Sequence, residues 1–118
     1  MRITKTEFGW IEVDGIRYET DIIIYPDGRI ENRYKNFSGN NHLIEKWEVT
    51  KVLSTDSKTK PEVFVVGTGQ MGIVKISDEV KIYLKAQGIK LIAEPTPQAL
   101  VSFNNAQGVK CGIFHVTC

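Results

Sequence analysis

The sequence lacks any apolar run approaching the roughly 20 residues that a membrane-spanning helix requires. It lacks a recognisable signal peptide as well, because Met1-Arg2-Ile3-Thr4 leads directly into sequence typical of a folded domain. No internal repeat and no low-complexity tract is visible. We therefore expect a cytoplasmic protein that does not associate with membranes. Its 118 residues (1–118) are enough for one domain with a single core.

Cysteine is scarce, with Cys111 and Cys118 as the two examples. In one extended strand their Cα atoms would lie about 23 Å apart at roughly 3.3 Å per residue, whereas a disulfide tolerates about 7 Å. We expect two free thiols, as in a reducing compartment. Cys111 and His115 would lie about 13 Å apart along the same strand, too far to share a zinc ion. The sequence places His42 near neither, so no metal site is expected.

The sequence also lacks an excess of charge of either sign, since the formal net charge is +1. No strong field therefore draws nucleic acid or a membrane surface to the protein. One stretch interleaves basic residues with tyrosines, but residues 1–40 hold six Lys/Arg against seven Asp/Glu. This balance favours a solvated sheet face over a nucleic-acid interface. The basic residues concerned are Arg17, Arg29, Arg33 and Lys35.

A glycine-rich stretch follows an apolar run and matches the G-x-G-x-x-G pattern of dinucleotide-binding proteins at Gly67, Gly69 and Gly72. Its context does not fit that function. In a dinucleotide site the glycines open a helix directly, whereas residues 73–76 intervene here and Ser77 is expected to cap the next helix. We expect no NAD and no other cofactor. The glycines are expected to form a tight turn close to a sheet.

The N-terminal third has the pattern of an antiparallel β-meander. Phe8–Val13 and Ile16–Tyr25 are rich in β-forming residues and are separated by Asp14-Gly15, a strong hairpin signal. Pro26-Asp27-Gly28 predicts a second turn, after which Arg29–Tyr34 alternates as a surface strand would. The apolar spacing of 42–53 then predicts a helix, and 54–60 a polar linker.

The second half alternates strands and helices. Strands are predicted at 63–67, 89–93 and 109–117, and a helix at 78–87 with Gly88 after its end. A further helix is predicted to have Thr96 as its N-cap and Pro97 as its first residue. Strands apolar on both faces imply a sheet covered on both sides. The fold class is therefore α/β (α+β), a single compact domain with an N-terminal antiparallel meander.

The order of these motifs resembles the Mth-type domain family of small uncharacterised proteins. The resemblance implies a three-layer fold with a mixed central sheet, no established catalytic activity, and no NAD or metal. The family's relatives include the adipogenesis-associated Mth-type domain protein and a mitochondrial complex I assembly factor, which loosely implies an assembly role. The motifs span most of the chain and are Tyr25–Arg29, Val65–Gly69, Ala86–Ile89, Thr96–Ala99, Phe103-Asn104 and Cys111–Cys118.

Candidate site residues lie at the ends of the predicted strands and helices. His115, in the last strand, could act as a general base or orient a ligand, or it could be a histidine buried in the sheet. Loops at the carboxyl ends of strands form the usual ligand crevice of α/β sheets. The amides at the start of the last helix could hold a small anion. The candidate ligand-binding residues are Gly67, Thr68, Gly69, Gln70, Thr96, Asn104 and His115, and no catalytic nucleophile is predicted.

Two functions remain open from the sequence. The first is a binding or assembly module that self-associates as a homo-oligomer, which an exposed tryptophan such as Trp10 or Trp47 would favour. The second is a small-molecule enzyme or sensor whose pocket joins the glycine loop to His115. We expect the glycine loop and His115 to border one cavity if a ligand site exists.

Overall fold

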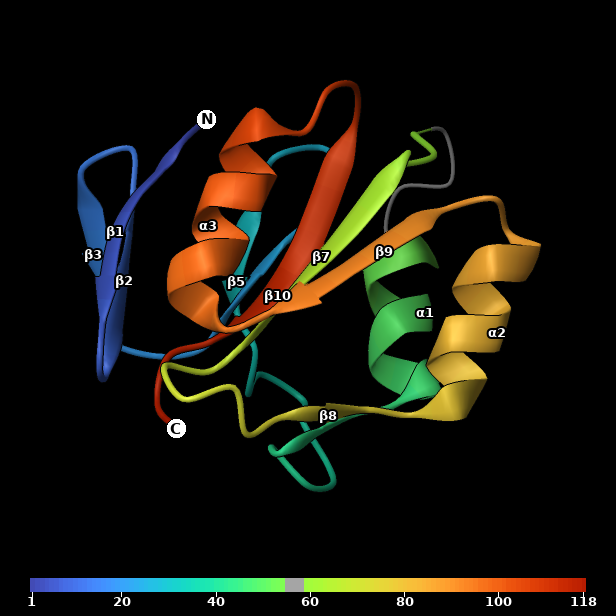
Figure 1. Cartoon of the computed structure of the whole chain (residues 1–118), viewed down its shortest axis with the longest axis horizontal. Helices are drawn as coiled ribbons and strands as arrows, with labels where there is room; N and C mark the ends of the chain where they lie inside the picture. The colour runs from blue at the N-terminus through green and yellow to red at the C-terminus, as the bar shows by residue number, and fades with distance from the viewer. Residues whose placement is uncertain (55–58) are drawn as a thin grey trace.

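A computed structural model describes residues 1–54 and 59–118, so part of the expected linker at 54–60 lies outside the described residues. Figure 1 shows helices on both sides of a central sheet and a smaller sheet beside helix α3. The elements in chain order are β1 (Ile3–Glu7), β2 (Trp10–Val13), β3 (Ile16–Tyr18), β4 (Ile22–Ile24), β5 (Ile30–Asn32), β6 (Leu43–Ile44), α1 (Lys46–Ser54), β7 (Val63–Thr68), β8 (Lys75–Ile76), α2 (Asp78–Ala86), β9 (Lys90–Glu94), α3 (Thr96–Asn105) and β10 (Lys110–His115).

The central sheet is mixed, with the strand order β5-β4-β10-β7-β9. Strand β10 runs parallel to β7, which in turn runs parallel to β9. Strand β4 pairs with the other edge of β10 in the antiparallel direction, and β5 continues from β4 as a hairpin. This arrangement confirms the expected α/β (α+β) class with its mixed central sheet. It also places the ends of β4, β10 and β7 next to one another, where the candidate site lies.

The N-terminal strands form their own antiparallel sheet, in the order β1-β2-β3. Asp14 and Gly15 have φ angles of 50° and 82°, the left-handed values that a two-residue hairpin turn requires. The single strand predicted over 16–25 is wrong, because the chain leaves the small sheet after β3 and enters the central sheet at β4. Strand β1, which the sequence analysis did not predict, completes the small sheet.

Two of the boundaries that differ from the sequence prediction lie near the candidate site. Helix α1 begins at Lys46 and not at His42, because Leu43 and Ile44 pair with β8 as a short parallel ladder. The last strand ends at His115, after which residues 116–118 pack against the glycine loop. Helix α2 begins as predicted, with the Ser77 hydroxyl accepting a hydrogen bond from the Val80 amide at 3.2 Å. None of the helices in the described ranges is long and apolar enough to cross a membrane.

Each face of the central sheet covers its own apolar core. The face that packs on α3 and the small sheet buries residues such as Ile11, Val65 and Phe114. The face that packs on α1 and α2 buries residues such as Val49, Leu84 and Ile113. Successive residues of a strand point to opposite faces, so His115 lies on the α1/α2 face together with Cys111 and Ile113.

Candidate functional site

Asp21 and His115 meet because strands β4 and β10 are neighbours. Asp21 directly precedes β4, and Ile22 of that strand pairs with Phe114 of β10. The His115 ring nitrogen Nδ1 lies 2.7 Å from Asp21 Oδ2, and the amide of Val116 donates to Asp21 Oδ1 at 2.8 Å. Both side chains are buried, with exposed fractions of 1% and 2%. The carboxylate therefore fixes the orientation of the imidazole ring.

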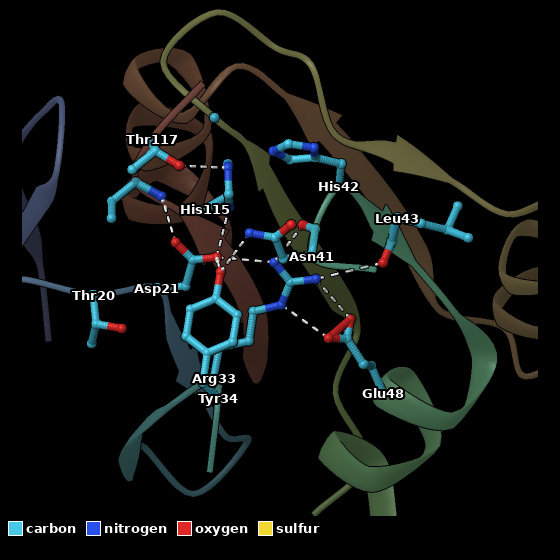
Figure 2. Close-up of polar contacts among 12 residues, drawn as sticks. Thr20, Asp21, Arg33, Tyr34, Asn41, His42, Leu43, Glu48, His115 and Thr117 are labelled. Carbon is cyan, nitrogen blue, oxygen red and sulfur yellow. Dashed lines mark hydrogen bonds and ion pairs between the residues drawn. The ribbon is translucent and has the colours of Figure 1, made fainter. Parts of the chain in front are cut away.

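Arg33 lies between two buried carboxylates. Its Nη1 donates to Asp21 Oδ2 at 2.9 Å, while Nε and Nη2 donate to the two carboxylate oxygens of Glu48 at 2.9 and 3.1 Å. Nη1 also donates to the carbonyl of Asn41 at 3.0 Å. Glu48 lies in the first turn of α1, so the contact joins that helix to the edge of the sheet. Figure 2 shows this arrangement, and we refer to Asp21, Arg33, Glu48 and His115 as the charged cluster.

Tyr34 completes the surroundings of Asp21 by donating its hydroxyl hydrogen to Oδ2 at 2.6 Å. Burial alone would raise the pKa of Asp21, but the hydrogen bonds from His115, Tyr34 and the Val116 amide outweigh it and lower that pKa. Burial also raises the pKa of Glu48, and there the Arg33 contacts do not compensate fully. The two carboxylates share one guanidinium, yet Asp21 is the one better stabilised as an anion.

The second ring nitrogen of His115 faces the end of the chain. Nε2 lies 2.9 Å from the Thr117 hydroxyl oxygen. Because the Asp21 carboxylate accepts from Nδ1, the neutral ring carries its proton on Nδ1 and accepts at Nε2. The ring of His42 stands edge-on to that of His115, with centroids 5.5 Å apart, and the Cys118 Sγ lies 3.8 Å from His42 Nε2. One potential ligand atom from each of His42, His115 and Cys118 lies within 4.8 Å of the others.

The glycine loop packs against the same end of the chain. The amides of Gln70 and Met71 donate to the carbonyls of Thr117 and Cys118 at 2.6 and 3.0 Å. Gly69 has a φ of 104°, and a Cβ atom there would lie 2.3 Å from the backbone of Cys118. The glycines thus permit a close backbone approach, as the sequence analysis expected. A phosphate would have to displace carbonyls that these amides already bind, although the absence of a dinucleotide stays a prediction.

Thr96 links the glycine loop to strand β10. Its hydroxyl accepts from the Gly69 amide at 2.9 Å and donates to the His115 carbonyl at 2.6 Å. Its predicted role as the N-cap is wrong, because Pro95 occupies the N-cap and Thr96 is the first residue of α3. The side chain is fully buried and ties the glycine loop to the end of β10, and anion binding at the start of α3 stays a prediction.

The structure brings most of the predicted site residues together but separates one of them. Asn104 lies at the far end of α3, where its side chain exchanges two 2.8 Å hydrogen bonds with the backbone of Ile3. Two surface pockets of about 310 and 390 Å³ occur elsewhere, and neither lining includes the glycine loop or His115. A cavity between them therefore stays a prediction. The residues placed side by side are Gly67, Thr68, Gly69, Gln70, Thr96 and His115.

Sequence reasoning missed most of the charged cluster. Arg33 was interpreted as part of a solvated face, which is wrong because its exposed fraction is 1%. Asp21 carried a usable signal, since a carboxylate directly before Ile22-Ile23-Ile24 must be buried with that strand or lie at its end. Glu48 had no comparable signal, because a glutamate in the first turn of a helix is normally exposed and interacts with the helix dipole.

The chain belongs to the family described as "Protein of unknown function (DUF498/DUF598)", which it matches over residues 3–110. The conserved hypothetical protein PH1505 from Pyrococcus horikoshii OT3 is 34% identical, with both chains covered completely and a TM-score of 0.85. A structure titled MT938 is 24% identical over 99% of this chain and 98% of its own, with a TM-score of 0.78, and shows the same fold.

A Bordetella pertussis protein described as a Mth938-like domain is 16% identical over 98% of this chain and 85% of its own, with a TM-score of 0.55. The search of curated proteins produced no match. The resemblance to the Mth-type domain family is thus confirmed. It brings a fold and a family of unknown function, so a function must be inferred from the residues of this chain.

Proposed function

We propose that the protein is a cytoplasmic binding or assembly module without catalytic activity, and that its first partner is a second copy of itself. The observation that carries this proposal is that the two segments hydrogen-bonded to residues 116–118 both carry exposed apolar side chains. Phe8, Met71 and Ile73 are 67%, 76% and 49% exposed. Large exposed apolar side chains on adjoining segments are typical of protein–protein contacts.

Hydrogen bonds hold the segments that carry these side chains next to one another. The Gly9 amide, in the turn that contains Phe8, donates to the Val116 carbonyl at 2.8 Å. The amides of Met71 and Ile73 both donate to the Cys118 carbonyl, at 3.0 and 3.3 Å. The side chain of Gln70 joins the glycine loop to strand β1 by donating to the Thr6 hydroxyl at 3.1 Å. The apolar side chains thus lie on segments that hydrogen bonds hold side by side.

The buried polar groups support a non-catalytic function. Within residues 1–54 and 59–118, every buried side-chain nitrogen or oxygen has a hydrogen-bond partner. Both ring nitrogens of His115 have partners, and Glu48 is bound to Arg33 through both oxygens. A general base needs a free lone pair within reach of a substrate, and these groups would first have to exchange partners.

Sedimentation velocity over a range of protein concentrations tests this proposal. We expect the wild type to sediment as a concentration-dependent dimer or larger particle and Phe8→Ser/Met71→Ser to sediment as a monomer. The matched control is Ile82→Ser, which removes an apolar side chain that is 70% exposed on α2 and should leave the association unchanged. A wild type that is monomeric at every concentration would refute self-association through this surface.

The alternative function is a small-molecule enzyme or sensor, and one observation favours it. The Asp21 carboxylate orients His115 as it would a catalytic histidine, and the ring lies against the glycine loop, where a Cβ on Gly69 would be 3.0 Å from its Cδ2 atom. A thermal-shift screen of metabolites with wild type and His115→Gln tests it. A compound that stabilises the wild type and not the variant would favour the enzyme or sensor over the assembly module. A screen that finds no such compound would favour the assembly module.

A further inference from the structure

Three potential metal ligands converge beside the glycine loop although they come from separate parts of the chain. His42 precedes β6, His115 ends β10, and Cys118 lies three residues further on. Their potential ligand atoms all lie within 4.8 Å of one another, and the Cys118 Sγ is 3.8 Å from His42 Nε2. Cys111, the thiol paired with His115 in the sequence analysis, is buried in β10. The position of His42 depends on strand pairing, which the sequence did not predict.

We propose that His42, His115 and Cys118 bind a divalent transition-metal ion, and that this ion is zinc. Zinc binds thiolate sulfur at about 2.3 Å and imidazole nitrogen at about 2.0–2.1 Å. In a tetrahedral site these bond lengths place ligand atoms about 3.3–3.6 Å apart. Ligand atoms that already lie within 4.8 Å therefore need a closure of only about 1 Å.

Backbone hydrogen bonds hold His42 and Cys118 in place, while their side chains are free to rotate. The His42 amide donates to Asn40 Oδ1 at 2.8 Å, and its carbonyl accepts from the Lys75 amide at 2.9 Å. The amides of Met71 and Ile73 hold the carbonyl of Cys118. The side chains of His42 and Cys118 are only partly buried, so they can rotate toward an ion. Preorganisation of this kind lowers the entropic cost of binding.

Asp21 supplies the outer contact that metal-binding histidines normally have. A ligand histidine usually donates its other ring N–H to a carboxylate, which fixes the tautomer and makes the ligand nitrogen more basic. His115 meets this condition, because Nδ1 lies 2.7 Å from Asp21 Oδ2, which leaves Nε2 as the ring nitrogen that can bind the ion. Nε2 is bonded to the hydroxyl of Thr117, a half-buried side chain that has to rotate away for the nitrogen to bind an ion.

The chemistry of the ligands selects the ion. Two imidazoles and one thiolate suit zinc and other borderline-soft metals, whereas magnesium and calcium require oxygen ligands. Three protein ligands leave the fourth tetrahedral position to water or to a group from a partner, as in zinc sites with an open position. The site and the proposed association surface adjoin at Cys118, but they use different side chains, because the ligands are His42, His115 and Cys118 and the association surface is formed by Phe8, Met71 and Ile73.

Cobalt(II) is the spectroscopic probe for this site, because it substitutes for zinc and reports its ligands. Titration of the reduced, chelator-treated protein should saturate at one equivalent and give a thiolate-to-cobalt charge-transfer band with the intense visible bands of a tetrahedral ion. Zinc added afterwards should abolish these bands. Competition with a chromophoric chelator then measures the affinity for zinc itself.

Variants of the two cysteines identify the thiolate ligand. Cys118→Ser should lose the charge-transfer band. His42→Ala should weaken zinc binding at least tenfold, because the loss of a ligand should cost no less than the loss of an outer contact. The matched control is Cys111→Ala. The Cys111 thiol is buried in the apolar core, so its removal should leave the spectrum unchanged. The proposal is overturned by a wild type without a charge-transfer band, or by a band that survives in Cys118→Ser and disappears in Cys111→Ala.

Discussion

The two faces of the central sheet are buried by different kinds of contact. The face toward α3 and the small sheet is closed by apolar contacts, including the edge-to-face pair of Phe103 and Phe114 with ring centroids 5.6 Å apart. The face toward α1 and α2 has a similar apolar core, but the charged cluster occupies its end. The difference is not required by the fold, since the first face shows that this sheet can be closed without buried charges.

Stability alone does not explain the charged cluster. Removing charges from water costs several kcal/mol per ion, and apolar replacements of buried ion pairs are often neutral or stabilising. What the cluster does achieve is geometric, because Asp21 fixes the ring of His115 and Arg33 fixes Asp21. We therefore interpret the charged cluster as a device that positions His115. The predictions below test how far the two faces really differ.

The largest effect is expected where the charged cluster loses its one arginine. Arg33→Ala leaves Asp21 and Glu48 buried without their cation and should lower the free energy of unfolding by about 3–5 kcal/mol. Urea denaturation at neutral pH measures the loss. The matched control is Arg29→Ala, which removes an exposed guanidinium 4.4 Å from the ring centroid of Tyr25 and should cost about 1 kcal/mol or less. Equal losses would show that the cluster is not a special feature of this face.

The two histidines should also contribute different amounts to the free energy of unfolding. His115→Ala removes a buried donor to Asp21 and should cost about 1–3 kcal/mol in unfolding free energy when a chelator is present. His42→Ala removes a partly exposed ring and should change stability by at most about 0.5 kcal/mol under the same conditions. Chemical denaturation of both variants separates them. An unchanged stability for His115→Ala would mean that the ring is not part of the packed structure.

On the opposite face, one side chain fastens the small sheet to α3. Asn104→Ala removes two hydrogen bonds to the backbone of Ile3, in a partly buried place that water can reach, and should cost about 1 kcal/mol. Its neighbour Asn105 is exposed, so Asn105→Ala is the matched control and should be nearly neutral. Thermal melts of the pair measure the difference. A larger loss than that of His115→Ala would reverse the ranking of the two faces.

The smallest expected effect is a raised pKa of Tyr34 in the folded protein. Burial and the hydrogen bond to Asp21 raise the pKa of Tyr34 from 10.0 to about 12. Because the folded protein keeps this proton longer than the unfolded chain, the stabilisation is complete below pH 10 and is lost as the pH rises through about 12. Tyrosinate absorbance should show one tyrosine titrating late, and Tyr34→Phe should remove that step. A late step that persists in the variant would assign it to another residue.

Local signals in the sequence predicted local structure well. Asp14-Gly15 forms the expected hairpin turn and Ser77 caps the expected helix, because both depend on neighbouring residues only. The glycine loop was correctly interpreted as a site of close backbone approach. The expectation that the glycine loop lies near His115 also holds, since β7 and β10 are parallel neighbours, while a shared cavity stays a prediction.

The charged cluster could not be predicted in this way. Asp21, Arg33 and Glu48 are brought together because β4 inserts beside β10 and β5 folds back along β4, a strand order that no local pattern encodes. For the same reason, the sequence did not predict that His42 lies close to Cys118, because this contact depends on the pairing of β6 with β8. Residues that look solvated within their own strand or helix thus became buried through contacts that are distant in sequence.

The central claim is that the charged cluster positions His115, and Asp21→Asn tests it most directly. The substitution keeps the shape of the side chain but removes the charge that holds the imidazole. We predict that the variant retains one cooperative thermal transition while its affinity for cobalt(II) falls about 10–100-fold, as for other outer contacts of metal-binding histidines. A folded Asp21→Asn protein with the cobalt affinity of the wild type would contradict the account.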